Sequence, residues 1–207
     1  MRLGAVLYND FELLDAYGPL EMFGCLGEDL EIAVIAEHKG GVKSSAGPQT
    51  MAEYDFMDAP DLDLLLLPGG IGTIPELENQ AMLDFLRERC PATDINMSVC
   101  TGSALFAKAG LLDGLRATSN KMFFSLASGQ SDKVVWVEDA RWIDAGQYVT
   151  SSGVSAGTDM ALAVIERLFG TERARAISEF TEYQWHTDAD ADPFAKFLNQ
   201  GTPEMLG

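Results

Sequence analysis

The sequence is poor in basic residues and in histidine. Its 207 residues contain 14 lysines and arginines against 32 aspartates and glutamates, a formal net charge of −18 at pH 7. So acidic a surface repels nucleic acids and anionic membranes, and we expect neither as a partner. The two histidines, His38 and His186, stand far apart in the chain. Because no histidine pair has the spacing of metal ligands, no metal site is predicted.

Cysteines are few, and long apolar runs are absent. Cys25, Cys90 and Cys100 are an odd number, widely spaced, with no CxxC pair. This pattern indicates a reducing compartment and no disulfide framework. The apolar run at the N-terminus stops at Asn9-Asp10, which is too short for a signal peptide or a membrane span. We therefore expect a cytoplasmic protein.

Strands and helices alternate along most of the chain, and the strands are continuously apolar. This favours one domain over residues 1–207, a flavodoxin-like three-layer α/β sandwich with a mainly parallel central sheet. An acidic extension is expected over 188–207. Predicted strands are Leu3–Tyr8, Leu30–Ala36, Leu62–Leu67, Ile95–Val99, Arg116–Ser119, Val134–Val137, Arg141–Ile143 and Tyr148–Ser151, with turns at Gly47-Pro48 and Asp144-Ala145-Gly146 suggesting hairpins. Predicted helices are Asn9–Gly27, interrupted at Gly18-Pro19, then Gln80–Arg89, Lys121–Ser128, Gly157–Phe169 and Thr171–Tyr183.

The stretch around Cys100 has the pattern of a nucleophile elbow. A short strand, Ile95–Val99, ends directly before Cys100, and a helix opens at Thr101-Gly102 and runs to Gly110. An elbow holds its central residue in a strained turn above the sheet. The helix dipole lowers a thiol pKa at this position, so we expect Cys100 to be the most reactive of the three thiols. The alternative is an inert, buried cysteine at the end of a core strand.

Two further groups lie near predicted strand ends. The Gly69-Gly70 loop follows an apolar strand, and its backbone N–H groups suit an oxyanion hole over Cys100. The alternative is that the two glycines only allow a tight turn. Asp15 and Glu21 lie in the otherwise apolar block LLDAYGPLEMF. A carboxyl group in an apolar site has a raised pKa and acts as a general acid near neutrality. The alternative places both carboxylates on the solvated face of a helix.

Four blocks together resemble the ThiJ/PfpI superfamily, which has a class I glutamine-amidotransferase-like fold. They are FELLDAYGPLEMF, LLLLPGGIGT, SVCTGSALFAKAGLLDGLRATSN and SSGVSAGTDMAL. The pairing of LDxxGPxE with SVCTG is similar to the isonitrile hydratase branch. That resemblance implies Cys100 as nucleophile, Asp15 as acid, Thr101 as the residue that positions water or the acid, and Gly69-Gly70 as backbone donors, with Glu21 as second choice for the acid. It also implies a homodimer, a small-molecule substrate and no cofactor.

The implied reaction is hydration of an isonitrile to an N-substituted formamide through a thioimidate on Cys100. Thr101 stands where superfamily members with protease or aldehyde-hydrating activity commonly have histidine. Asn120-Lys121 stands where hydratase-like members often have histidine, so the substrate pocket is expected to differ from theirs at this place. The next three residues, Met122, Phe123 and Phe124, either line the pocket or belong to the core. Alternatives are a redox-sensing or non-catalytic protein with an oxidisable Cys100 thiol, and a general cysteine hydrolase. A transcription regulator would need a DNA-binding domain, for which we expect no room after Phe169.

Overall fold

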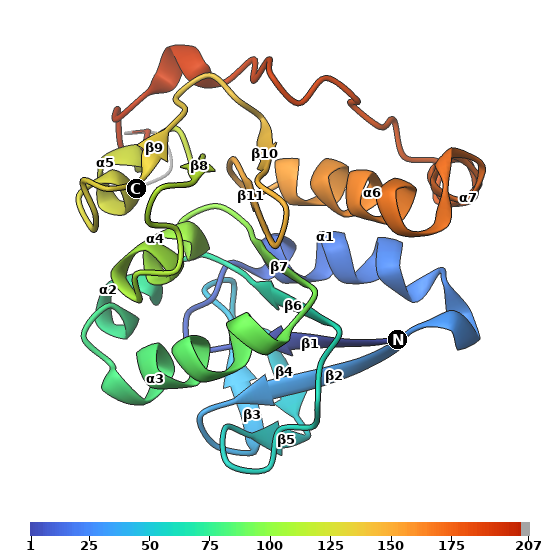
Figure 1. The fold of residues 1–207 in the computed structure, drawn as a ribbon, viewed down its shortest axis with the longest axis horizontal. Helices are drawn as coiled ribbons and strands as arrows, with labels where there is room; N and C mark the ends of the chain where they lie inside the picture. The colour runs from blue at the N-terminus through green and yellow to red at the C-terminus, as the bar shows by residue number, and fades with distance from the viewer. Residues whose placement is uncertain (204–207) are drawn as a thin grey trace.

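The computed structural model describes residues 1–203, and its centre is a seven-stranded sheet (Figure 1). The last four residues of the expected extension, 204–207, lie outside the described residues. Along the sheet the strands are β10 (Trp142–Asp144), β11 (Tyr148–Ser151), β7 (Ile95–Ser98), β6 (Leu64–Leu67), β1 (Arg2–Val6), β2 (Glu31–Ala36) and β5 (Tyr54–Asp55). Neighbouring strands are parallel except for β10 and β11. The predicted mainly parallel α/β sandwich is confirmed.

Helices cover both faces of this sheet and bury its side chains. Strand β6 shows how: Leu64 and Leu66 join the apolar cluster under one helical layer, while Leu65 and Leu67 join the cluster under the other. Because side chains alternate along a strand, a continuous leucine run is buried on both faces. The first layer contains α1 (Leu13–Gly24), α6 (Ala156–Phe169) and α7 (Thr171–Phe180); the second contains α2 (Thr73–Glu76), α3 (Gln80–Arg89), α4 (Gly102–Lys108) and α5 (Phe124–Ser128).

Two small sheets lie beside the main one. The first small sheet is the predicted hairpin around Gly47-Pro48, formed by β3 (Gly40–Lys43) and β4 (Gln49–Ala52). The hairpin predicted around Asp144-Ala145-Gly146 lies within the main sheet, where it joins β10 to β11. Strands β8 (Arg116–Ala117) and β9 (Val135–Trp136) pair only with each other among the described strands. Short 3₁₀ turns lie at Gly27–Asp29, Cys90–Ala92 and Ala195–Phe197.

The predicted interruption at Gly18-Pro19 is wrong, because α1 runs unbroken through it. Proline removes one helical hydrogen bond and crowds the carbonyl four residues back, which here belongs to Asp15. Packing offsets this loss: Gly18 lies so close to the Thr158 hydroxyl that a Cβ there would clash with it, and the Pro19 ring packs against Gly157 of α6. The unbroken helix turns Asp15 inward, where it is buried, and Glu21 outward, where it is exposed.

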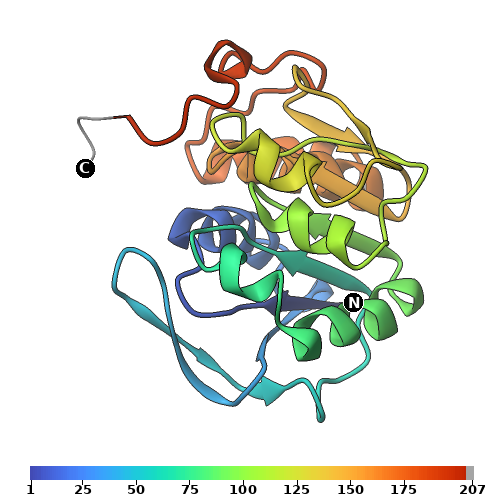
Figure 2. The same cartoon turned by 90° about the vertical axis from the view of Figure 1, so that its left-hand side faces the viewer.

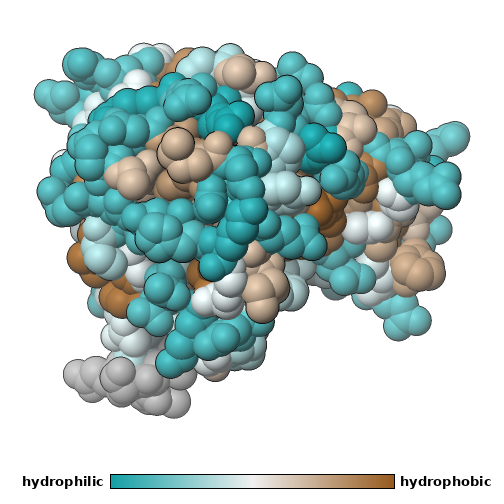
Figure 3. Space-filling view, turned by 90° about the horizontal axis from the view of Figure 1, so that it is seen from below, coloured by the Kyte–Doolittle hydropathy of each residue, from teal (hydrophilic) through white to brown (hydrophobic). Residues whose placement is uncertain are grey.

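The chain after α7 crosses the molecule to the region of α5 (Figures 1 and 2). Helix α5 itself starts at Phe124 rather than at the predicted Lys121, because Asn120 and Lys121 make polar contacts inside the protein. The end of the molecule that carries β5 is mainly hydrophilic, with apolar residues in small separate groups (Figure 3). None of the helices within residues 1–203 combines the length and apolar character needed to cross a bilayer.

Candidate active site

Cys100 lies at a sharp turn between β7 and α4. Its backbone φ is +58°, in the left-handed region that a non-glycine residue adopts at some energetic cost. The Cys100 N–H donates to the Ser152 carbonyl at 3.0 Å, which anchors the turn to the end of β11. A Cβ on Gly102 would lie 2.5 Å from the Leu67 carbonyl oxygen, so glycine allows α4 to start this close to β6. This is the predicted nucleophile elbow.

Asp15 approaches Cys100 from α1 and is fully buried. The Gly69 N–H donates to its Oδ2 at 2.9 Å, whereas Oδ1 has no hydrogen-bond partner among residues 1–203. Burial raises the pKa of this carboxyl group to about 8, against smaller lowering effects of the Gly69 N–H and the Cys100 thiol. A carboxyl group that keeps its proton at neutral pH beside a thiol is equipped to act as a general acid.

Thr101 belongs to a row of hydroxyl groups that starts at Tyr8. The Tyr8 hydroxyl donates to the Pro68 carbonyl at 2.7 Å and lies 2.9 Å from the Thr73 hydroxyl. The Thr73 hydroxyl lies 2.9 Å from that of Thr101. Since the single Tyr8 proton goes to Pro68, Thr73 donates to Tyr8. Thr101 then donates to Thr73 rather than to the more distant Gly70 carbonyl at 3.3 Å, because otherwise no proton would lie between the two threonine oxygens. The Thr101 oxygen accepts from the Gly70 N–H at 3.0 Å and keeps one lone pair for another donor.

The Gly69-Gly70 loop lies beside Cys100, but its two N–H groups bind protein atoms rather than facing an empty oxyanion position. Gly69 binds Asp15 and Gly70 binds Thr101. A Cβ on Gly69 would lie 2.5 Å from the Thr101 nitrogen and 3.0 Å from Asp15 Oδ2, so only glycine fits between them. The loop thus positions the two side chains predicted to assist Cys100.

The sulfur of Cys100 receives hydrogen bonds from three donors. The Asn120 amide donates to Sγ at 3.1 Å, and the backbone N–H groups of Thr101 and Val154 also contribute. These bonds lower the thiol pKa, but burial and the Asp15 carboxylate raise it, and the net pKa is well above its usual value. The predicted lowered pKa is therefore wrong. The sequence pattern located the helix N-terminus but not the burial, which leaves Cys100 only 6% exposed.

We expect alkylation of Cys100 by iodoacetamide to accelerate with pH past the ordinary thiol value of about 8.5, because the reactive thiolate forms late. The rate is measured by peptide mass spectrometry over a pH series, with the partly exposed Cys25 as internal reference. A plateau in Cys100 labelling below a pH of about 7.5 would instead support the lowered pKa that the sequence pattern predicted.

A pocket of about 290 Å³ opens above Cys100. It is lined by Glu12, Ser45, Gly70, Ile71, Ile74, Cys100, Thr101, Asn120, Phe123, Leu126, Val154 and Thr202. Of the three candidate pocket residues, Phe123 lines it, Met122 lines a neighbouring pocket, and Phe124 is buried in the core. Neither Asp15 nor Glu21 is among the residues that line the pocket: Asp15 is fully buried beside Cys100, whereas Glu21 lies exposed on the outer face of α1. Asp15, Thr101 and the Gly69-Gly70 loop gather at Cys100.

Sequence reasoning did not assign Asn120, Val154 or Thr73 to the site. Asn120 was noted only as a departure from histidine, although it contacts the reactive sulfur directly. The sequence contained a weak indication that Thr73 belongs to the site, since this residue directly follows the glycine loop. Val154 contributes its backbone N–H at a φ of +33°, which no sequence pattern indicates.

Comparison with known proteins agrees with this geometry. The DJ-1/PfpI family model matches residues 2–167. Isonitrile hydratase from Pseudomonas putida is 32% identical over 204 residues, covering 99% of this chain and 84% of that protein. Protein DJ-1 homolog A from Arabidopsis thaliana is 29% identical over 171 residues, covering 81% of this chain and 43% of that protein. A crystal structure of a ThiJ/PfpI family protein from Pseudomonas syringae superposes with a TM-score of 0.80 at 29% identity, covering 93% of this chain and 76% of that one. With its elbow cysteine, glycine loop and sheet order, this chain belongs to the DJ-1/PfpI family.

Proposed function

We propose that this protein is an isonitrile hydratase-like cysteine enzyme, which converts an isonitrile into an N-substituted formamide through a covalent thioimidate on Cys100. The observation that carries the proposal is the buried Asp15 carboxyl group beside the thiol, with a pKa of about 8. The 32% identity to the isonitrile hydratase of Pseudomonas putida supports the same assignment. An isonitrile is activated by a proton at its terminal carbon, which is what a neutral carboxyl group supplies.

The first step joins the thiol and the isonitrile carbon. Asp15 donates its proton to the terminal carbon as the Cys100 sulfur forms a bond to that same carbon, and the carboxylate takes up the thiol proton. The product is a thioimidate, in which the former triple bond to nitrogen has become a double bond. No net charge is created in the buried pocket, which matters because an unpaired buried charge is strongly disfavoured. Proton transfer from a positioned acid contributes typically about 10²–10⁴-fold to the rate.

The second step adds water to the thioimidate carbon. The hydroxyl of Thr101 has committed its proton to Thr73, so its free lone pair accepts a hydrogen bond from the attacking water. Asp15 receives a proton from the water and returns one to the substrate nitrogen. The carbon–sulfur bond then breaks, the sulfur regains a proton, and the formamide leaves. Each group returns to its starting protonation state.

Two observations weigh against the other candidate activities. A cysteine hydrolase needs donors for a tetrahedral oxyanion, and here the Gly69 and Gly70 N–H groups are bound to Asp15 and Thr101. A redox-sensing cysteine is typically an accessible, low-pKa thiolate, and Cys100 is buried with a raised pKa. Isonitrile hydration needs neither an oxyanion hole nor a resting thiolate.

The proposal is tested by incubating the purified protein with a panel of alkyl and aryl isonitriles and assaying formamide by chromatography and mass spectrometry. We expect catalytic formamide formation by the wild type and none above background by Cys100→Ala. During turnover, intact-mass analysis should show an adduct that equals the protein plus one isonitrile. If no member of the panel is converted, or if Cys100→Ala converts it equally well, the proposed activity is rejected.

A further inference from the structure

The C-terminal segment 188–203 reaches the surroundings of Cys100 although it is distant from that residue in the sequence. Thr202 lines the Cys100 pocket, and Phe194 lines a second pocket of about 190 Å³ that Asn120 also lines. Asn120 and Val154, two of the groups that bind the Cys100 sulfur, line both pockets. The segment therefore borders both pockets that Asn120 lines.

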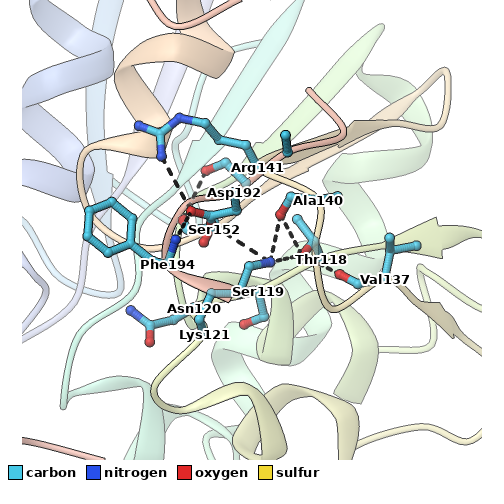
Figure 4. A network of polar contacts seen from close by, with 12 residues as sticks. Thr118, Ser119, Asn120, Lys121, Val137, Ala140, Arg141, Ser152, Asp192 and Phe194 are labelled. Atoms are coloured by element: carbon cyan, nitrogen blue, oxygen red, sulfur yellow. Dashed lines mark hydrogen bonds and ion pairs between the residues drawn. The ribbon is translucent and has the colours of Figure 1, made fainter. Parts of the chain in front are cut away.

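Asp192 joins this segment to the protein through a buried group of charges (Figure 4). Its Oδ2 lies 3.9 Å from Lys121 Nζ, and its Oδ1 lies 3.7 Å from Arg141 Nη1. The Asp192 side chain is 0% exposed and that of Lys121 is 2% exposed. Lys121 also donates to the Thr118 hydroxyl and to the Ala140 carbonyl at 2.7 and 2.6 Å. Burial lowers the pKa of Lys121 to about 8, against the opposing effects of Asp192, Asp139 and Glu138, so Lys121 is charged at neutral pH. A buried ammonium group needs a carboxylate partner, and among the ion pairs of the described residues Asp192 is the one that pairs with Lys121.

Backbone hydrogen bonds tie the same segment to the residues around Lys121. The Asn199 N–H donates to the Lys121 carbonyl at 2.8 Å, and the Gly201 N–H donates to the Met122 carbonyl at 3.0 Å. In return, the Ser125 N–H donates to the Asn199 side chain at 2.7 Å. The segment thus fixes both the side chain and the backbone of Lys121.

Lys121 directly follows Asn120, whose amide binds the Cys100 sulfur at 3.1 Å. Asn120 has little space in which to move, because a Cβ on Gly153 would lie 2.5 Å from its amide nitrogen. Its amide oxygen accepts from the Phe123 N–H at 3.1 Å, so the side chain orientation depends on the 120–123 backbone. Displacement of Lys121 would therefore move the donor away from the sulfur.

We propose that Asp192 is a positioning residue of the active site, which acts through Lys121 to hold the Asn120 amide on the Cys100 sulfur. Segment 188–203 is then part of the catalytic apparatus rather than a surface extension. The inference applies to the reactive thiol that the proposed function uses, but its test reads the thiol itself and does not require an isonitrile.

The test measures the rate of Cys100 alkylation by iodoacetamide in the full-length protein at pH 7, where Lys121 is charged and the rate is proportional to the small thiolate fraction. Asn120→Ala removes one hydrogen bond to the thiolate, so the thiol pKa should rise by about 1 unit and the rate should fall about tenfold. Asp192→Asn should lower the rate in the same direction, and the double variant should match Asn120→Ala alone, because both changes remove the same contact. The difference between Asp192→Asn and the wild type should shrink as pH rises through about 8, because the wild-type ion pair is then lost. Asp190→Asn, an equal change of charge at an exposed position in the same segment, should leave the rate unchanged.

An unchanged rate in Asp192→Asn at pH 7, or a double variant whose fold-loss equals the product of the two single losses, would overturn the inference. If Asp192→Asn does not fold, the double variant of Lys121→Met with Asp192→Leu leaves no unpaired charge, and the same comparison is made with it. Failure of the wild type to convert any isonitrile, together with these rate losses, would reject the proposed function and leave the role of Asp192 intact.

Discussion

Replacing Asp15 by asparagine should lower kcat for isonitrile hydration by at least about 100-fold, because the amide cannot donate an acidic proton to the isonitrile carbon. The variant keeps the size of the side chain and an oxygen that accepts from the Gly69 N–H. Steady-state kinetics with the best isonitrile of the panel measures the effect. Cys100 should remain open to alkylation, with a lower midpoint of its pH profile, since the carboxylate that raises the thiol pKa is gone.

Glu21→Gln is the matched control for this prediction. It makes the same chemical change on the same helix, but at a position exposed to solvent rather than buried beside Cys100. We expect kcat within about twofold of the wild type, as for an ordinary surface substitution. A large loss in Glu21→Gln with near-full activity in Asp15→Asn would reverse the assignment of the acid.

The same carboxyl group makes both activity and stability depend on pH. Its proton is needed for the first step, so kcat should fall as pH rises through about 8, the pKa of Asp15 in the folded protein. In the unfolded chain its pKa lies near 3.8, so between these values the folded state binds one proton more than the unfolded state. The contribution of Asp15 to stability is therefore largest at low pH and is lost as pH rises through this range. The free energy of unfolding of Asp15→Asn, compared with that of the wild type, should therefore be higher above a pH of about 8 than at low pH.

Replacing Asp159 by asparagine should lower the free energy of unfolding by about 3 kcal/mol, because it leaves a buried guanidinium group with its main carboxylate partner removed. Asp159 is fully buried in α6 and accepts from Arg141 Nε at 2.7 Å. It also accepts from the Tyr183 hydroxyl and the His186 N–H at 3.0 and 2.9 Å, so it holds the chain after α7 in place. Urea denaturation followed by circular dichroism measures the loss.

Lys108→Gln provides the comparison at the surface. Lys108 Nζ lies 3.1 Å from Glu78 Oε1, and the two side chains are 35% and 82% exposed. Ion pairs in water contribute about 0–1 kcal/mol, so we expect a correspondingly small change. A loss in Asp159→Asn no larger than in this control would mean that the remaining contacts of Arg141, including Asp192 at 3.7 Å, already satisfy its charge.

Most strands of the sheet, their mainly parallel arrangement and the place of Cys100 were predictable because they follow from local patterns, whereas the order of the strands was not predicted. Four-residue apolar runs such as Leu64–Leu67 specify buried strands, and a cysteine between a strand and a small-residue helix specifies an elbow. The position of Asp15 was predictable only in part: its inward direction depends on α1 being continuous, and periodicity alone could not decide this across Gly18-Pro19. Contacts between α1 and α6 settle the helix, and such contacts join residues more than 130 positions apart.

The electrostatics of the site were the least predictable part. A helix N-terminus is visible in sequence and favours a thiolate, whereas the burial of Cys100 arises from several segments closing over it. The buried pairing of Asp192 with Lys121 likewise joins residues 71 positions apart, within a stretch whose acidic composition indicates only a solvated extension. Burial of a charge depends on its partners in three dimensions, which composition does not specify.

The hydroxyl groups of Tyr8, Thr73 and Thr101 all point their hydrogens the same way, and that direction is set at the end farthest from the substrate. The Pro68 carbonyl can only accept, so it orients Tyr8, Tyr8 orients Thr73, and Thr73 orients Thr101. A row that ends on a carbonyl oxygen cannot pass a proton onward to solvent, and it therefore acts as a fixed line of dipoles rather than as a proton wire. Tyr8 thereby determines whether a threonine two contacts away presents a lone pair or a hydrogen to the pocket.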